Sequence, residues 1–200
     1  MAVLALVLVV LAAVGGLPQY FRRFRGRSHR LLYATAGTQL TLLGAAAILA
    51  ATAGAAGGPA GVNAPVAAAF TVAAAALGGG PVTLAILRLS HREDVAEERD
   101  RDAAAAGGGG TPARPDTTAE GPGQPVLRGG AWIGVLERTA IAATLWAGWP
   151  EGLAVVLAVK GLGRYSELGQ DGAAERFILG TFASVLWACA CAGIGFLLRA

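Results

Sequence analysis

Hydrophobic residues gather in six long runs separated by short polar or glycine-rich segments. This pattern is typical of an α-helical protein that crosses a membrane repeatedly, because a membrane helix needs roughly 20 mainly apolar residues. The first four runs extend over about Ala2 to Leu17, Leu31 to Ala53, Ala64 to Leu87 and Ala131 to Gly148. A turn at Trp149–Gly152 leads into the fifth, which reaches about Glu167, and the sixth covers about Phe177 to Leu198. The sequence therefore predicts an all-α, polytopic membrane helix bundle with about six transmembrane helices.

The first run is short, so a signal peptide is an alternative interpretation. A signal peptide carries basic residues before its apolar segment. Here no Lys or Arg precedes the run, and the charges follow it. We therefore expect a retained anchor.

The runs fall into two three-span membrane blocks, residues 1–88 and 129–200, joined by residues 89–128. The joining segment opens with a mixed-charge run from Arg88 to Asp102, which is typical of a solvated helical extension. It continues as a Pro/Gly/Thr tract with too few apolar residues to build a core. We expect a flexible tether; a regulatory or partner-docking segment is the alternative.

Basic residues predict the orientation, because they favour cytoplasmic loops. They gather in the first connection, in the 89–128 segment and in the last connection, and the opposite side holds only the terminal Arg199. The first connection contributes Arg22, Arg23, Arg25, Arg27 and Arg30. We predict a multi-pass protein of the cell membrane with both termini outside the cytoplasm and the 89–128 loop inside it.

Composition supports this interpretation. The chain is 54% apolar and only 14% charged, far from an ordinary soluble domain. The formal charge of +3 does not indicate a nucleic-acid partner, since the basic residues flank apolar runs. Cys189 and Cys191 lie within an apolar run and are expected to be small packed side chains. No metal site or cofactor is predicted.

Span three contains the sequence Gly78-Gly79-Gly80-Pro81. Proline removes a backbone donor and glycine weakens a helix, so these residues predict a kink. A kink used for helix packing is the favoured interpretation, and a broken helix that lines a transport site is the alternative.

The second block carries an intramembrane charge cluster. Charged side chains are costly in hydrocarbon and usually face the bundle interior in pairs. We expect Lys160 to need a partner most and Glu137 to supply it, whereas Arg138 can extend toward cytoplasmic headgroups. The cluster could lock the helices together, bind an anionic lipid or small molecule, or form a proton or ion path. Its members are Glu137, Arg138, Lys160, Arg164, Glu167, Glu175, Arg176, Thr181 and Ser184.

Span six also carries small residues at four-residue spacing, Gly180, Ser184 and Ala188. Such a stripe permits close helix contact. Packing within the chain is favoured, and homo-oligomerisation through the stripe is the alternative.

Three C-terminal motifs occur in order, Gly-x-x-Ile-Gly-x-Leu-Glu-Arg from Gly130 to Arg138, Lys-x₃-Arg-x₂-Glu from Lys160 to Glu167, and Ala-Glu-x-x-Ile-x-Gly-Thr-x₂-Ser from Ala174 to Ser184. Together they resemble the C-terminal segment of a bacterial family of multi-pass membrane proteins of unknown function. The resemblance implies membership and a bacterial inner membrane, but no activity.

The sequence thus predicts a binding, scaffold or lipid-interacting membrane protein. A small transporter or channel subunit is the alternative, and it requires the Gly78–Pro81 segment to approach the charge cluster. A membrane enzyme is less favoured, because the chain shows no nucleophile–base set and no phosphate-binding loop.

Overall fold

The computed structural model describes residues 1–20, 29–55, 62–106, 130–165 and 172–199. Within these ranges the chain is helical and has no strand, which confirms the all-α prediction for this part of the chain. The elements are α1 (Ala2–Gly16), the short 3₁₀ helix η1 (Leu17–Tyr20), α2 (His29–Ala55), α3 (Ala64–Ala106), α4 (Gly130–Trp146), α5 (Gly152–Gly163) and α6 (Ala173–Leu198).

Three helices are long and apolar enough to cross a membrane, over Arg30–Ala55, Ala64–Ser90 and Ala173–Leu198. A hydrocarbon core is about 30 Å thick and a helix rises about 1.5 Å per residue. With 15 and 12 residues, α1 and α5 are apolar but shorter than such a span. By length and composition, the described chain is therefore a helix bundle with three candidate membrane spans.

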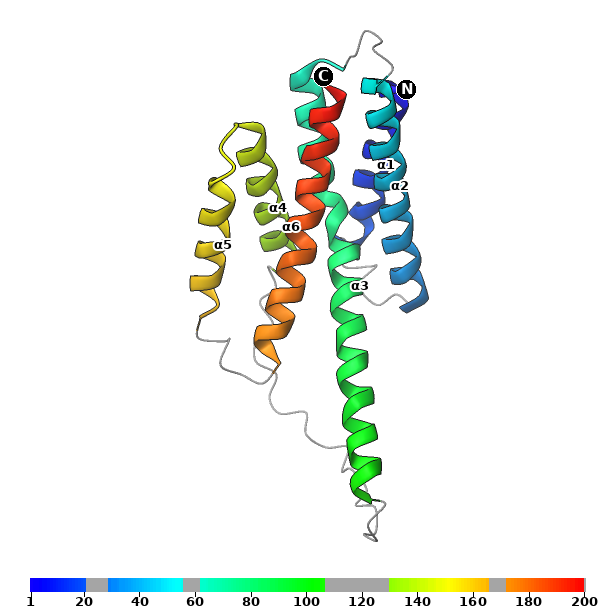
Figure 1. The fold of residues 1–200 in the computed structure, drawn as a ribbon, viewed down its shortest axis with the longest axis vertical. Coiled ribbons are helices and arrows are strands. Elements are labelled where there is room, and N and C mark those ends of the chain that lie inside the picture. The colour runs from blue at the N-terminus through cyan, green and yellow to red at the C-terminus, as the bar shows by residue number, and fades with distance from the viewer. Residues whose placement is uncertain (21–28, 56–61, 107–129, 166–171, 200) are drawn as a thin grey trace.

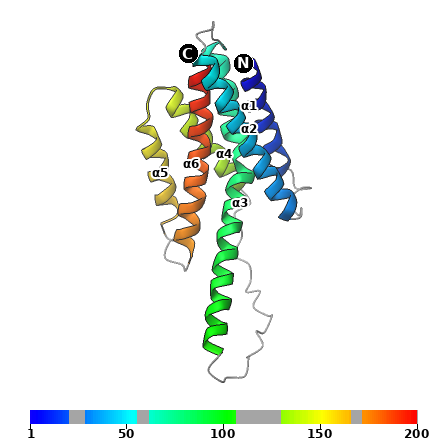
Figure 2. The same cartoon turned by 45° about the vertical axis from the view of Figure 1, so that its right-hand side comes forward.

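The two predicted blocks pack together as one bundle. The most extensive helix contact joins α3 to α6, and α4 packs against both of them. α2 also contacts α6, whereas α5 packs mainly against α4 and lies at the edge of the bundle (Figure 1). The two chain termini lie at the same end (Figures 1 and 2). Residues 1–88 and 129–200 consequently share one core.

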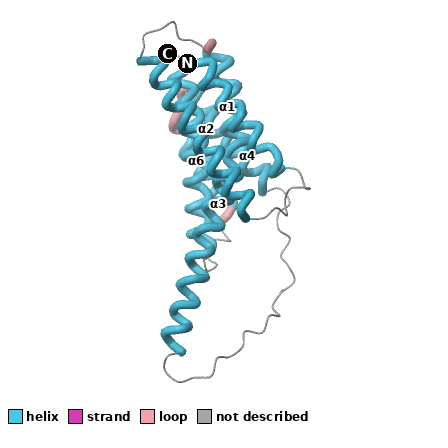
Figure 3. Tube along the Cα trace, turned by 90° about the vertical axis from the view of Figure 1, so that its right-hand side faces the viewer, coloured by secondary structure: helices cyan, strands magenta, loops and turns pink. Residues whose placement is uncertain are grey.

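Helix α3 does not end near Leu87. It continues through Pro81 and on to Ala106, and its last turns project beyond the other helices at the end opposite the termini (Figure 3). The mixed-charge run from Arg88 to Asp102 is part of this extension, as its charge pattern indicated. The predicted flexible linker is therefore helical over its first part, and residues 107–129 lie outside the described residues.

Helices α4 and α5 form a hairpin whose turn contains Trp149 and Pro150. Gly148 has φ +71°, a conformation that glycine adopts without strain. At Gly152 a Cβ would lie 2.6 Å from Cγ2 of Thr144, so only glycine lets the two helices approach this closely. The short turn brings α4 and α5 side by side. Glu137 of α4 consequently lies opposite Lys160 of α5.

Candidate functional site

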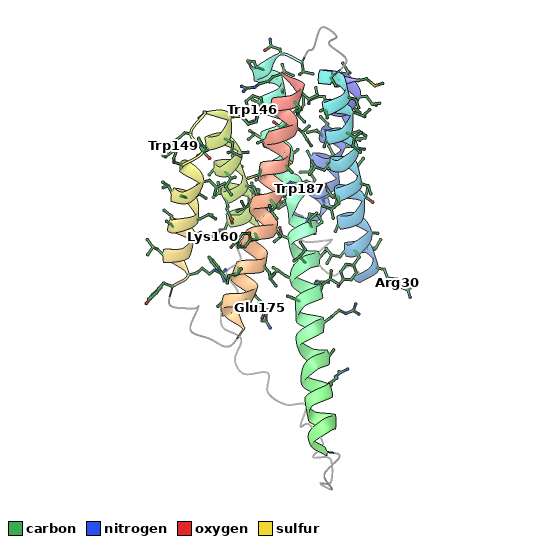
Figure 4. The ribbon with its side chains drawn as sticks, in the orientation of Figure 1. Arg30, Trp146, Trp149, Lys160, Glu175 and Trp187 are labelled. Carbon is green, nitrogen blue, oxygen red and sulfur yellow. The ribbon has the colours of Figure 1, made fainter. Side chains whose placement is uncertain are left out.

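Carbonyl oxygens in the middle of α3 accept hydrogen bonds from side chains of three other elements. Trp187 on α6 donates its Nε1–H to the Ala74 oxygen at 3.1 Å, and the labelled Trp187 side chain lies at the centre of the bundle (Figure 4). Arg138 on α4 donates Nε–H to Ala75 at 2.9 Å and Nη2–H to Ala76 at 2.9 Å. We call residues 74–81 the α3 centre.

Tyr20, the last residue of η1, completes these contacts. Its hydroxyl accepts a 3.1 Å hydrogen bond from Nη2 of Arg138 and lies 3.4 Å from the carbonyl oxygens of Ala76 and Leu77. Pro81 has no N–H to donate to the Leu77 carbonyl four residues earlier. Side-chain donors from neighbouring helices can satisfy backbone groups around such a proline.

The glycines of the α3 centre make room for these side chains. A Cβ at Gly79 would lie 2.6 Å from Cδ1 of Trp187 and 2.8 Å from Cδ of Arg138. A Cβ at Gly78 would lie 2.7 Å from Cζ2 of Trp187. The Gly78–Pro81 sequence therefore packs three helices closely while α3 stays helical throughout, so the favoured packing interpretation describes this segment.

Helices α1 and α2 approach the same place from the other side. A Cβ at Gly16 of α1 would overlap the Leu77 carbonyl oxygen. Gln39 of α2 is 2% exposed, and neither its Oε1 nor its Nε2 has a hydrogen-bond partner among the described residues. Its amide lies beside Gly15 and Gly78, where their Cβ atoms would be 3.2 Å and 3.3 Å away. The α3 centre is thus contacted from α1, α2, α4 and α6.

Arg138 is a buried cation without an ionic partner in the described part of the chain. It is 3% exposed, and its hydrogen bonds go to two carbonyl oxygens and one hydroxyl. The sequence suggested that Arg138 can extend toward cytoplasmic headgroups; in the structure the carbonyl oxygens of Ala75 and Ala76 hold its guanidinium in the interior. Its Nη1 makes no hydrogen bond to the described residues and lies beside Gly134, whose Cβ would be 3.1 Å away.

The predicted pair of Glu137 and Lys160 is present. Lys160 Nζ lies 2.6 Å from Oε2 of Glu137, and the two side chains are 22% and 6% exposed. The ammonium is also 5.5 Å from the ring centroid of Phe177 on α6. The second carboxylate oxygen, Oε1, is buried without a hydrogen bond to the described residues. This pair ties the hairpin of α4 and α5 together and neutralises both charges.

The remaining predicted residues do not join this pair. Arg164 directly follows α5, and Glu175 and Arg176 lie in the first turn of α6. All three are exposed, and the labelled Glu175 lies at the end away from the chain termini (Figure 4). Thr181 and Ser184 lie inside the bundle, and their hydroxyls have no partner among the described residues. Glu167 lies outside the described residues. The predicted cluster therefore divides into Arg138 of α4, which bonds the carbonyl oxygens of α3, the Glu137–Lys160 pair, and an exposed charged end.

The small-residue stripe of α6 is used within the chain. A Cβ at Gly180 would contact Leu87 of α3 at 3.4 Å, and Ser184 and Ala188 are 2% and 0% exposed. The stripe lies against other helices of the same chain, in agreement with the packing interpretation.

The sequence did not indicate that Tyr20 and Trp187 contact the α3 centre. Tyr20 follows a Gly-Gly-Leu-Pro-Gln sequence, and no residue spacing relates it to α3 or α4. Trp187 lies among apolar residues of α6 and is indistinguishable there from a lipid-facing tryptophan. A weak signal for Tyr20 existed in Pro81, because the Leu77 carbonyl loses its helical donor there and can accept a hydrogen bond from another element.

The described residues contain no group of three or more side chains that could hold a metal ion. Comparisons with family models, curated proteins and solved structures found no match. The resemblance of the C-terminal motifs to a bacterial membrane family therefore stays a prediction.

Proposed function

We propose that this chain is a lipid-interacting membrane protein of the binding or scaffold kind, which crosses a bacterial inner membrane six times and binds anionic lipid headgroups at its basic end. The observation that carries the proposal is the uneven distribution of arginines along the bundle. Among the described residues, Arg30, Arg164 and Arg176 lie where helices begin or end away from the chain termini, and Arg88 lies at the start of the α3 extension. At the other end, Arg199 is the only arginine among the described residues.

This distribution supports anionic lipids as partners. Basic residues near a cytoplasmic membrane surface attract anionic lipids, at about 1 kcal/mol for each Lys or Arg. The arginines therefore favour a site for the negatively charged headgroup of a phospholipid over a soluble macromolecular partner.

A small transporter or channel subunit is the second candidate, because the α3 centre does approach one member of the predicted charge cluster, Arg138. Two features weigh against it. The backbone oxygens that could bind a transported cation already accept hydrogen bonds from Arg138, Tyr20 and Trp187. Glu137, the buried carboxylate nearest in sequence, is paired with Lys160. Proteoliposomes should accordingly show no protein-dependent flux of protons or potassium, and such a flux would favour transport.

The lipid proposal is tested in nanodiscs made of phosphatidylcholine with or without phosphatidylglycerol. We expect phosphatidylglycerol to raise the thermal unfolding temperature and to remain bound in native mass spectrometry. The double variant Arg164→Gln/Arg176→Gln should reduce both effects, whereas Arg199→Gln at the opposite end should leave them unchanged. The proposal would be contradicted if the wild-type chain had the same unfolding temperature in both lipid compositions and retained no phosphatidylglycerol in native mass spectrometry.

A further inference from the structure

Two hydroxyl groups of α6 differ from the other helical hydroxyl groups of the described chain. Elsewhere in the described helices, each threonine or serine donates to a carbonyl oxygen three or four residues earlier, a common arrangement for these residues within helices. The members of this first group are Thr35, Thr38, Thr41, Thr52, Thr71, Thr83, Ser90, Thr139 and Thr144. In contrast, Oγ1 of Thr181 and Oγ of Ser184 are sealed from solvent and make no hydrogen bond to a described residue. Both hydroxyls therefore lack the partner that a buried polar group requires.

Glu137 supplies a third buried oxygen without a partner. Its Oε2 accepts a hydrogen bond from Lys160, whereas its Oε1 is sealed from solvent and accepts none from the described residues. An ionised carboxylate can only accept hydrogen bonds, and each of its oxygens has two lone pairs for them. Glu137 thus presents an open acceptor, and the two hydroxyls of α6 present open donors.

The three oxygens face the same space by rotation around α6. Lys160 Nζ lies 5.5 Å from the ring centroid of Phe177, so Phe177 marks the direction from α6 to the Glu137–Lys160 pair. Successive helical residues rotate by about 100°, which puts Thr181 about 40° to one side of Phe177 and Ser184 about 20° to the other. The two hydroxyls therefore lie on either side of the direction in which the carboxylate is found.

Heights along the bundle agree as well. Helices α4 and α6 both run toward the end that holds the chain termini (Figure 1). A Cβ at Gly79 of α3 would meet both Cδ of Arg138 and Cδ1 of Trp187, so these two residues lie at one level. Glu137 precedes Arg138, and helical side chains point back toward the N-terminus of their helix. Its carboxylate is consequently level with the turn of α6 before Trp187, which contains Ser184.

We propose that Glu137 Oε1 and the hydroxyls of Thr181 and Ser184 form a binding site for one buried water molecule between α4 and α6. Residues three apart on a helix hold their Cβ atoms about 5–6 Å from each other, a separation that one water can bridge between two hydroxyl groups. The water accepts a hydrogen bond from each hydroxyl and donates one to the carboxylate. Buried waters typically make about three hydrogen bonds, to polar groups that are otherwise unsatisfied. The water thereby links the ion pair of the α4–α5 hairpin to α6.

The charges around the site favour water over a metal cation. A hard cation would also take oxygen ligands. However, the carboxylate of Glu137 already bonds the ammonium of Lys160 at 2.6 Å, and the next residue of α4 is the cationic Arg138. A further cation would face two positive charges and one negative charge. A water molecule adds no charge to the bundle interior, where uncompensated charge is costly.

A double-mutant cycle in the full-length chain tests the site by reversible unfolding in mixed detergent micelles. Thr181→Val and Ser184→Ala each remove one hydroxyl from the water. Thr139→Val is the matched control, because the Thr139 hydroxyl bonds a carbonyl of its own helix. We expect each α6 variant to raise the equilibrium constant of unfolding roughly tenfold, as the loss of a hydrogen bond at a buried site implies. The control should change it by less than about threefold.

One water serves both hydroxyls, so the double variant Thr181→Val/Ser184→Ala should lose clearly less stability than the two single losses combined. Fully combined losses would overturn the shared site, because each hydroxyl would then have a partner of its own. Unchanged or increased stability in the single variants would also overturn it, since deleting a dry, unbonded hydroxyl removes a buried polar group that costs free energy. Replacement of sodium by choline in the buffer should leave the wild-type stability unchanged, and a sodium-dependent stability would replace the water with a cation.

Discussion

The guanidinium of Arg138 on α4 donates a 2.9 Å hydrogen bond through Nη2 to the carbonyl oxygen of Ala76 on α3. Its Nε bonds the preceding carbonyl, Ala75, so the planar fork joins the two helices at two successive peptide groups. Lysine has a single nitrogen and cannot form this fork. The contact connects the two halves of the chain at the point where α3 contains its glycines and proline.

Replacement of Arg138 by lysine should therefore destabilise the protein although the charge is kept. Hydrogen bonds from charged groups contribute about 1.5–3 kcal/mol each, so we expect a loss of about 2–3 kcal/mol in the free energy of unfolding. Reversible unfolding in mixed detergent micelles measures the loss. Arg30→Lys is the control for a general arginine effect, since Arg30 is exposed in the first turn of α2. A loss below about 0.5 kcal/mol for Arg138→Lys would show that the fork contributes little.

Gly79→Ala should be among the most damaging single-methyl additions in the chain. The new Cβ would lie 2.6 Å from Cδ1 of Trp187 and 2.8 Å from Cδ of Arg138, and both side chains are held by hydrogen bonds to α3. Overpacking of this kind costs about 1–3 kcal/mol.

The matched control is Gly37→Ala on α2, where a Cβ meets nothing within 4 Å. There the helix propensity of alanine should make the change neutral or stabilising by up to about 1 kcal/mol. The same unfolding experiment compares the two variants. A cost at Gly37 equal to that at Gly79 would mean that the closeness of Trp187 and Arg138 has no energetic consequence.

Hydrophobic periodicity and length predicted the helices well, because runs of apolar residues in a protein surrounded by lipid leave the helix as the simplest way to satisfy backbone groups. The pairing of Glu137 with Lys160 was also predictable. A short Pro- and Gly-containing turn fixes the register of α4 against α5, so counting residues back from Trp149 gives the depth of both side chains.

The helix that Arg138 contacts could not be predicted in the same way. Glu137 and Arg138 are adjacent in sequence, and a cluster drawn from their shared depth ignores the rotation of about 100° between them. That rotation directs Glu137 toward α5 and Arg138 toward α3. Which helix each side chain meets depends on how α3 packs against α4. These helices are far apart in the chain, so no spacing pattern in the sequence indicates their contact. Tyr20 was missed for the same reason.

The Glu137–Lys160 pair should behave as a coupled unit. Removing one partner of a buried ion pair costs about 3–5 kcal/mol, because the other charge stays buried without compensation. Lys160 is 22% exposed, so water screens part of this cost and we expect Lys160→Met to lose about 2 kcal/mol. The double variant Lys160→Met/Glu137→Gln should lose less than Lys160→Met alone. Unfolding free energies of both single variants and the double variant complete the cycle, and strictly additive losses would mean that the pair is not formed in the membrane.

The orientation of the bundle can be read with two engineered cysteines at opposite ends. Ala96 is exposed on the extension of α3, and Asn63 is exposed just before α3 begins. Because basic residues favour the cytoplasmic side, Ala96 should lie inside the cell and Asn63 outside it. A membrane-impermeant maleimide added to intact cells should label Asn63→Cys, and it should label Ala96→Cys only after permeabilisation.

The parent chain provides the background for this experiment, because Cys191 is 0% exposed and Cys189 also lies within the apolar helix α6. A chain in which both are alanine confirms that the signal comes from the new thiols. Labelling of Ala96→Cys in intact cells, with protection of Asn63→Cys, would reverse the orientation. In that case Arg164 and Arg176 would face the outer leaflet, and the anionic lipids proposed to bind there would have to come from that leaflet.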